Sequence, residues 1–163
     1  MACLIRPATP ADLPHIVRLV RGLAEYERLL HEFTATEADF QRMLFDPDHA
    51  ADGFMAEVDG APVGIALYHR TIGTFQGQIG LFLEDLFVDP AFRGEGIGLA
   101  LLRALARLAI DRGYNIIEWR VLDWNEPAIG FYEKLGATRM TDWHTRRLRG
   151  ADLASLAEGA SHG

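Results

Sequence analysis

The chain has 163 residues, of which 49% are apolar and 24% charged, a composition typical of one globular domain that excludes collagen-like, low-complexity and wholly disordered chains. Lys and Arg number 16 against 23 Asp and Glu, giving a formal net charge of −7, which argues against nucleic acid or an anionic membrane as a partner. The single cysteine, Cys3, excludes an internal disulfide and a site made of several thiolates.

The first predicted elements are a strand and two helices. Residues 3–6 favour a strand. Thr9 and Asp12 have the spacing of a helix N-cap and its third residue, with a proline between them at the first helical position, so a helix should begin there. Thr36 and Asp39 repeat this spacing and predict a second, shorter helix.

A hairpin and a buried strand follow. The dipeptide Asp59-Gly60 separates apolar runs at 53–58 and 63–69, and it predicts a hairpin because a type I′ turn needs positive φ at both central residues. Residues 71–80 are polar and contain glycine, which predicts a loop. Residues 81–88 are apolar on both faces, as in a central strand that is covered on both sides.

The second half of the chain alternates helices with strands. The pattern predicts a helix at 98–111, a two-sided strand at 116–122 and a helix capped by Asn125. A final pair of strands is expected at 137–140 and 145–149. This order predicts an α/β fold around one mixed sheet.

A glycine-rich turn joins the strand at 81–88 to the helix that follows it. Residues 93–98 have the sequence RGEGIG, in which alternate glycines let the backbone come close to a ligand. The N–H groups at the helix start converge and the helix dipole adds partial positive charge, so the turn suits phosphate. A glycine-rich connection without a ligand is the alternative. Neither the Rossmann spacing nor the P-loop motif fits.

This turn resembles the R/Q-x-x-G-x-G/A signature of the GNAT acetyltransferase superfamily. Three further segments are similar to the same superfamily: 86–88, 125–128 and 131–137. The likeness covers nearly the whole chain and is strongest to the diamine (spermidine/spermine) and thialysine N-acetyltransferases. Four segments carry this closer likeness: 5–9, 23–27, 83–88 and 124–127. The resemblance implies the acyl-CoA N-acyltransferase fold, a single mixed, mostly antiparallel sheet that is splayed at its centre and flanked by helices.

The resemblance also implies acetyl-CoA as co-substrate. In the family, the main chain after the central strand binds pantetheine, the glycine-rich turn holds the pyrophosphate and the start of a later helix flanks the pantetheine. The implied cofactor-binding residues are Leu86, Phe87, Val88, Arg93, Gly94, Glu95, Gly96, Ile97, Gly98, Leu99, Asn125, Pro127 and Ala128. The strands ending at 88 and 122 should splay apart to admit the cofactor. A metal is not expected, since none of the six histidines pairs with another at metal-ligand spacing.

Acetyl transfer needs a group that takes the proton of the amine, whose pKa is about 10.4 when free, and an acid for the leaving thiolate. The resemblance implies Tyr132 as that acid, with a packed core aromatic as the alternative. Glu84 and Asp85 are neighbours in an apolar strand, where successive side chains point to opposite faces, so at least one should lie inside or at a cleft. The resemblance implies that Glu84 helps remove the amine proton, directly or through water. A carboxylate bonded to a neighbouring loop is the alternative.

The resemblance implies substrate binding by Tyr26, Glu27, Glu84, Glu118, Trp119 and Arg120. The expected substrate is a small cation, namely a polyamine, a diamine or a lysine-like amino acid, whose primary amine attacks directly; Arg120 is unfavourable for a polycation. The alternatives are a protein lysine or another amine acceptor, or a non-catalytic acyl-CoA-binding module.

The chain is expected to be cytoplasmic and to have no membrane partner, because the sequence shows neither a signal-peptide pattern nor an apolar run of about 20 residues. Residues 1–157 should form a single domain, and 158–163 a flexible tail. The likeness implies a homodimer, and an exposed edge on the final strand pair would favour pairing of two chains.

Overall fold

The computed structural model describes residues 3–159, and the chain divides after Leu122 into two compact units. The first unit contains β1 (Cys3–Pro7), α1 (Leu13–Tyr26), α2 (Glu37–Leu44), β2 (Asp52–Val58), β3 (Ala61–Gly73), β4 (Gln78–Val88), α3 (Ile97–Asp111) and β5 (Ile117–Trp119). Short 3-10 turns occur at Pro10–Asp12, Leu30–Glu32 and Pro90–Phe92. The second unit contains α4 (Glu126–Lys134) and α5 (Gly150–Ala157). Of the tail expected at 158–163, residues 160–163 lie outside the described residues.

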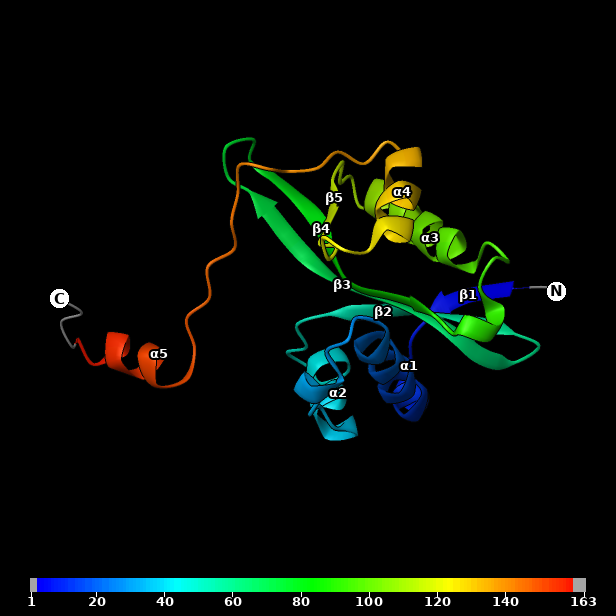
Figure 1. Cartoon of the computed structure of the whole chain (residues 1–163), viewed down its shortest axis with the longest axis horizontal. Helices are drawn as coiled ribbons and strands as arrows, with labels where there is room; N and C mark the ends of the chain where they lie inside the picture. The colour runs from blue at the N-terminus through cyan, green and yellow to red at the C-terminus, as the bar shows by residue number, and fades with distance from the viewer. Residues whose placement is uncertain (1–2, 160–163) are drawn as a thin grey trace. The chain divides into compact units, whose positions relative to one another are not determined.

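The first unit is a five-stranded sheet in the order β1-β2-β3-β4-β5. The first three pairs of strands are antiparallel and the β4–β5 pair is parallel, so the prediction of a mixed, mostly antiparallel sheet is confirmed. In Figure 1, α1 and α2 cover one face of this sheet and α3 covers the other. β4 therefore lies between helices, which explains why its sequence is apolar on both faces.

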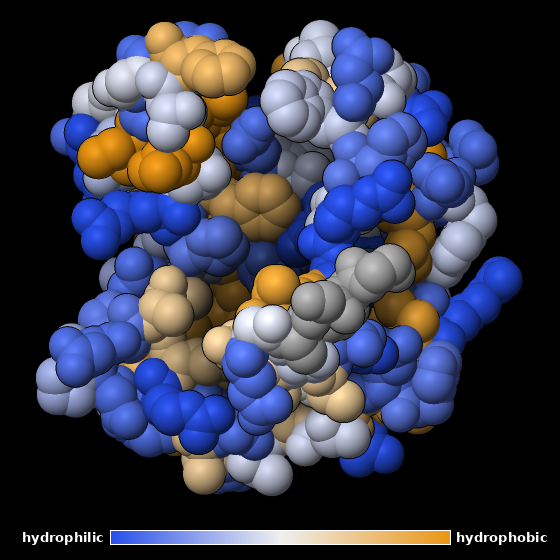
Figure 2. Space-filling view, turned by 90° about the vertical axis from the view of Figure 1, so that its left-hand side faces the viewer, coloured by the Kyte–Doolittle hydropathy of each residue, from blue (hydrophilic) through white to orange (hydrophobic). Residues whose placement is uncertain are grey.

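Each face of the sheet has its own apolar core. Ile16 and Leu19 of α1 are fully buried against strand residues that include Ile65 and Phe87. On the opposite face, Leu101 is one of the buried leucines of α3. Figure 2 shows hydrophilic side chains spread over much of one face of the molecule, with smaller apolar areas between them. This distribution fits the charged composition of the chain.

Both predicted helix starts form. The Asp12 carboxylate accepts hydrogen bonds from the backbone N–H of Thr9 (2.8 Å) and from its hydroxyl (2.9 Å). Asp39 accepts the equivalent two bonds from Thr36 at 2.9 and 2.8 Å. These reciprocal caps satisfy donors that a helix start leaves without a partner in the helix. The first helix begins with a 3-10 turn, so that α1 itself starts at Leu13, and it ends at Tyr26.

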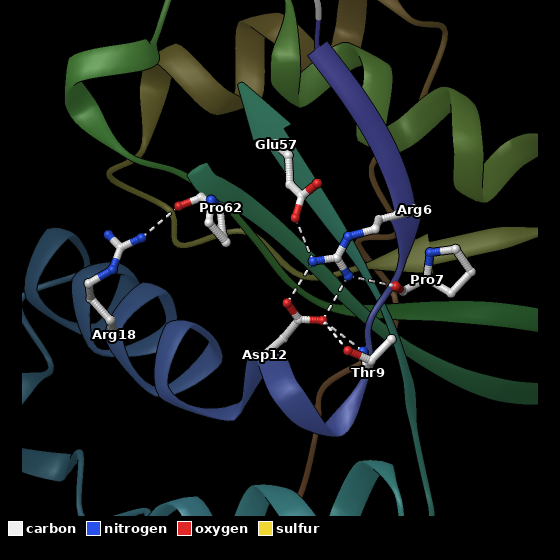
Figure 3. A network of polar contacts seen from close by, with 7 residues as sticks. All are labelled: Arg6, Pro7, Thr9, Asp12, Arg18, Glu57 and Pro62. Atoms are coloured by element: carbon white, nitrogen blue, oxygen red, sulfur yellow. Dashed lines mark hydrogen bonds and ion pairs between the residues drawn. The ribbon is translucent and has the colours of Figure 1, made fainter. Parts of the chain in front are cut away.

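A network of charged side chains joins the start of α1 to the sheet (Figure 3). Arg6 on β1 donates two hydrogen bonds of 2.7 Å to Asp12 and one of 2.6 Å to Glu57 on β2. The Arg6 guanidinium lowers the pKa of Asp12 to about 2. This pairing stabilises the folded state at pH values above 3.8, the ordinary pKa of the group. The stabilisation is lost as the pH falls toward 2. Arg18 of α1 adds a bond of 2.7 Å to the carbonyl of Pro62 on β3.

The predicted hairpin is confirmed, and a second one replaces a predicted loop. Asp59 and Gly60 have φ of 50° and 78°, as the type I′ turn requires. The loop expected at 71–80 is wrong for most of its length, because β3 runs to Gly73 and pairs with β4 from Gln78 onward. Polar composition suggested a loop there, whereas backbone hydrogen bonds between the two strands hold the segment extended.

The C-terminal part of the chain departs most from expectation. Residues 137–140 and 145–149 contain no strand, so the predicted final strand pair is wrong. The sequence also gave no prediction of α5, which follows at Gly150–Ala157. A strand forms only where another strand supplies backbone partners, and a β-favouring composition does not supply that partner. β5 is likewise shorter than the predicted strand at 116–122.

Candidate active site

The glycine-rich turn leads from the end of β4 into α3. Gly94 and Gly96 have φ of 82° and 77°, and a Cβ added at either position would meet nothing within 4 Å. The space beside the main chain of these two glycines is therefore open. Among the described residues, the first backbone hydrogen bond into α3 runs from the N–H of Ala100 to the carbonyl of Gly96 (2.9 Å). The N–H groups that precede Ala100 lie at a helix N-terminus. The turn therefore fits the diphosphate that the sequence predicts there.

Arg93 fixes this turn against β4 and α1. Its Nε donates a hydrogen bond of 3.0 Å to the carbonyl of Val88. Its guanidinium carbon lies 4.7 Å from the ring centre of Tyr26 at the end of α1 and 5.3 Å from that of Phe87. These contacts are cation–π interactions. The side chain of Arg93 thus links the turn to three of the residues predicted to bind cofactor or substrate.

The pairing between β4 and β5 is short. It covers only Leu81 with Ile117, Phe82 with Glu118 and Leu83 with Trp119, whereas β4 continues to Val88. Within the described residues, the stretch 84–88 therefore has no strand partner on the β5 side. Its backbone groups can bind an extended chain of amides in the manner of an added strand. The pairing thus ends before Val88, the end of the strand at which the sequence predicts a separation.

A β-bulge lies at the point where β4 and β5 part. Leu67 of β3 pairs with Asp85, but the next residue, Tyr68, pairs with Leu83. Glu84 is the extra residue on β4. A bulge interrupts the regular alternation of side chains and bends the strand.

The bulge brings Glu84 and Asp85 to the same face of the sheet. Asp85 lies opposite Leu67, which belongs to the core beneath α1. Glu84 contacts His69, two residues beyond Leu67 and hence on the same face. The expectation that the two carboxylates point to opposite faces is wrong, because one inserted residue shifts the alternation.

Glu84 lies between two nitrogen-bearing side chains. One carboxylate oxygen is 3.3 Å from Nε2 of His69, and the other accepts a hydrogen bond of 3.3 Å from Arg120. The ring of Phe82 supports both partners: it stacks on the His69 ring at 5.2 Å, and the Arg120 guanidinium lies 5.1 Å from its centre. His69 is not among the residues that the sequence predicts for the site. In the β3–β4 ladder His69 pairs with Phe82, and its contact with the bulged Glu84 depends on this pairing, which no local pattern of the sequence signals.

Asp85 is a second candidate proton acceptor, which the sequence did not select. Its side chain is partly buried, and this burial, with the nearby charges of Glu84 and Glu27, raises its pKa to about 6. Burial also raises the pKa of Glu27, which follows α1 directly. A carboxylate whose pKa lies near the working pH is suited to accept a proton and release it again.

The raised pKa of Asp85 predicts a cost in stability. Its folded value of about 6 exceeds the ordinary 3.8, so the folded state holds a proton that the unfolded chain releases, and stability falls as the pH rises from 4 to 6. We expect Asp85→Asn to increase the free energy of unfolding by about 1–3 kcal/mol at pH 7.5. The increase should disappear near pH 4, as measured by urea unfolding at both values.

The exposed Glu95→Gln variant is the matched control for this experiment, because it removes a carboxylate that is open to solvent. It should change stability little at either pH. An increase for Asp85→Asn that is equally large at pH 4 and pH 7.5 would contradict a titration of Asp85 as its cause.

The remaining predicted residues are divided between the two units. Glu118 and Trp119 lie on β5 beside Phe82 and Leu83 of β4. In the second unit, the buried Asn125 caps α4, and its side-chain oxygen accepts a hydrogen bond of 3.4 Å from the N–H of Ala128. Pro127 lies in the first turn of α4. Tyr132 is further along the same helix, where its ring centre is 5.4 Å from that of Phe131.

Residues 3–159 contain neither a metal-ligand cluster nor a membrane-spanning helix. No group of three or more His, Cys, Asp or Glu side chains in this part of the chain could hold a metal ion. None of its helices is long and apolar enough to cross a membrane.

The chain is similar to a known protein family, to related enzymes and to a solved structure. Residues 18–137 match the acetyltransferase (GNAT) family model. The chain is 34% identical over 165 residues to a thialysine N-epsilon-acetyltransferase of Bos taurus, with 94% of this chain and 96% of the relative covered. It is 30% identical over 197 residues to an L-ornithine N5-acetyltransferase of Arabidopsis thaliana, covering 93% and 86%. An integron cassette protein from the mobile metagenome of V. cholerae superposes with a TM-score of 0.80 at 25% identity, over 97% of this chain and 99% of that chain.

Proposed function

Because this chain belongs to the GNAT acetyltransferase family and is an N-acetyltransferase, we propose that it transfers the acetyl group of acetyl-CoA to a primary amine of a small cationic substrate. The observation that carries this proposal is the group of carboxylates formed by Glu27, Glu84 and Asp85 near the open end of β4. Such a group attracts an ammonium ion and can take its proton. The relatives named for thialysine and ornithine support the same class of acceptor.

The proposed acetyl-CoA site follows the main chain from β4 into α3. Residues 86–88 would pair with the pantetheine amides, and the N–H groups of 94–99 would hold the pyrophosphate. The open space at Gly94 and Gly96 supports this assignment. Asn125, Pro127 and Ala128 are assigned to the pantetheine from the sequence resemblance.

The proposed reaction is a direct attack without an enzyme nucleophile. Glu84 and Asp85 bind the substrate as an ammonium ion and remove one proton. The free amine then adds to the thioester carbonyl carbon, which forms the carbon–nitrogen bond and an oxyanion. The nitrogen gives its second proton to the other of these two carboxylates, and collapse of the oxyanion breaks the carbon–sulfur bond. Tyr132 supplies the proton that the leaving thiolate takes up. Tyr26, Glu27, Glu118, Trp119 and Arg120 are assigned to the amine site.

A panel of acceptors tests this function. Thiol release from acetyl-CoA is measured with diamines, polyamines, diamino acids, lysine peptides and an aminoglycoside. The proposal expects the highest kcat/KM for a small amine of the first three classes. A preference for peptides or aminoglycosides would overturn the acceptor class, and binding of acetyl-CoA without turnover of any acceptor would favour a non-catalytic module.

We further propose that residues 1–157 act as one acetyltransferase domain in the cytoplasm. The family match at 18–137 extends across both compact units and supports a single functional domain. The proposed location is supported by the cysteine content. With one cysteine the chain cannot form an internal disulfide and so needs no oxidising compartment.

We also propose a homodimer, although the strand pair that first suggested it is absent. The support is now the number of exposed apolar side chains in the C-terminal segment: Met140, Trp143, Leu148, Leu153 and Leu156. A second copy of the chain related by two-fold symmetry would cover such residues. Light scattering should give about twice the chain mass of 18.1 kDa, and a monomeric mass at micromolar concentration would overturn the dimer.

A further inference from the structure

A guanidinium contacts one of the carboxylates that are proposed to bind the amine. Arg120 follows β5 directly, rests on the ring of Phe82 and reaches one oxygen of Glu84 at 3.3 Å. A guanidinium has five N–H donors in a planar fork, and this contact uses one of its nitrogens. The Arg120 side chain is 54% exposed, so its fork is accessible to a small molecule.

Two other basic side chains near the site, those of Arg93 and His69, are held differently. Arg93 is bound to the carbonyl of Val88 and packed on two aromatic rings. His69 has a partner for each ring nitrogen, namely the carbonyl of Arg70 and the carboxylate of Glu84. Of these three basic groups, Arg120 is therefore the one best placed to contact a substrate on the side of Glu84.

An arginine in this position disfavours one class of amine and favours another. A diamine or polyamine carries a second ammonium ion, which Arg120 would repel. A diamino acid carries a carboxylate on the carbon that bears its second ammonium ion, and arginine binds carboxylates by two parallel, charge-assisted hydrogen bonds. The site thus offers negative charge for the reacting end of a molecule and positive charge for a carboxylate.

We propose that Arg120 binds the carboxylate of the acceptor, so that the substrate is a diamino acid acetylated on its distal primary amine. This assignment rests on the proposed acetyltransferase function. It makes Arg120 the residue that separates diamino acids from diamines of the same length. Glu84 then has two partners in turn: Arg120 when the site is empty and the ammonium ion when substrate is bound.

Two matched pairs of acceptors test the proposal: lysine with cadaverine, and ornithine with putrescine. The members of each pair differ only in the carboxylate. The wild-type enzyme should have the higher kcat/KM for the amino acid of each pair. Lysinamide, which keeps the size of lysine but lacks its carboxylate charge, should behave like the diamine.

In Arg120→Met, the ratio of kcat/KM for lysine to that for cadaverine should fall about 10–100-fold, the effect of losing charge-assisted hydrogen bonds. Most of the change should appear as a higher KM for lysine. Arg120→Lys keeps the charge without the fork and should give an intermediate ratio. Arg107→Met removes an exposed arginine from α3 and should leave the ratio at the wild-type value.

The outcomes separate this proposal from the one on which it rests. A wild-type preference for the diamines, or an unchanged ratio in both Arg120 variants, overturns the role of Arg120 and leaves the acetyltransferase function standing. Absence of turnover with all five compounds, in an enzyme that acetylates only peptides or aminoglycosides, overturns both. Because lysinamide tests the carboxylate on the wild-type enzyme, the result does not depend on the folding of a variant.

Discussion

Replacing Tyr132 with Phe is expected to lower kcat about 10²–10⁴-fold, the range by which a general acid accelerates a reaction. The substitution keeps the ring and its packing beside Phe131 and removes only the phenolic proton. The affinity for acetyl-CoA should change little. Steady-state thiol release gives kcat, and calorimetry gives the affinity.

Tyr114→Phe is the matched control, since Tyr114 follows α3 and has no proposed role in the chemistry. It should keep the wild-type kcat. Wild-type turnover in Tyr132→Phe would mean that the thiolate leaves unassisted or takes its proton from another donor.

Glu84→Gln should give a different result, because Glu84 is proposed to act on the amine and not on the thiolate. The loss of activity should be largest at low pH, where the amine is most fully protonated, and a higher pH should restore part of it. A pH profile parallel to that of the wild type would make Glu84 structural and leave Asp85 as the remaining candidate acceptor.

Gly96→Val is expected to abolish binding of acetyl-CoA. The backbone at Gly96 has a φ of 77°, which strains a β-branched residue, and the added side chain would fill the open space where the pyrophosphate is proposed to bind. Calorimetry should show a Kd at least about 100-fold weaker, since several backbone hydrogen bonds to a charged group are lost together.

Gly77→Val separates this effect from backbone strain. Gly77 lies in the β3–β4 turn with a φ of 61°, and an added Cβ there also meets nothing within 4 Å. This control should lose a similar amount of stability and keep its affinity for acetyl-CoA. Unchanged affinity in Gly96→Val would overturn the pyrophosphate assignment.

Local signals in the sequence located most elements of the first unit. The caps at Thr9 and Thr36 and the turn at Asp59-Gly60 depend on hydrogen bonds and φ angles within a few residues. The loop predicted at 71–80 failed because pairing between two strands, and not local composition, decided its conformation.

The sequence proposed residues for the candidate site but not their arrangement. The adjacent Glu84 and Asp85 identified the place in the sequence. Which way they point depended on a bulge whose position is set by pairing with β3. The contacts of His69 and Arg120 with Glu84 join residues 15 and 36 positions apart, and such separations leave no periodic trace in the chain.

The sequence by itself determined the glycine-rich turn, the helix caps, the first hairpin and the membership of a family of acetyltransferases, because each depends on residue types at short, fixed spacings. The tertiary structure decided that Glu84 and Asp85 share a face, that Glu84 lies between a histidine and an arginine, and that residues 137–149 form no strand. These outcomes depend on which distant segments supply backbone partners and on how burial changes the pKa of a carboxyl group.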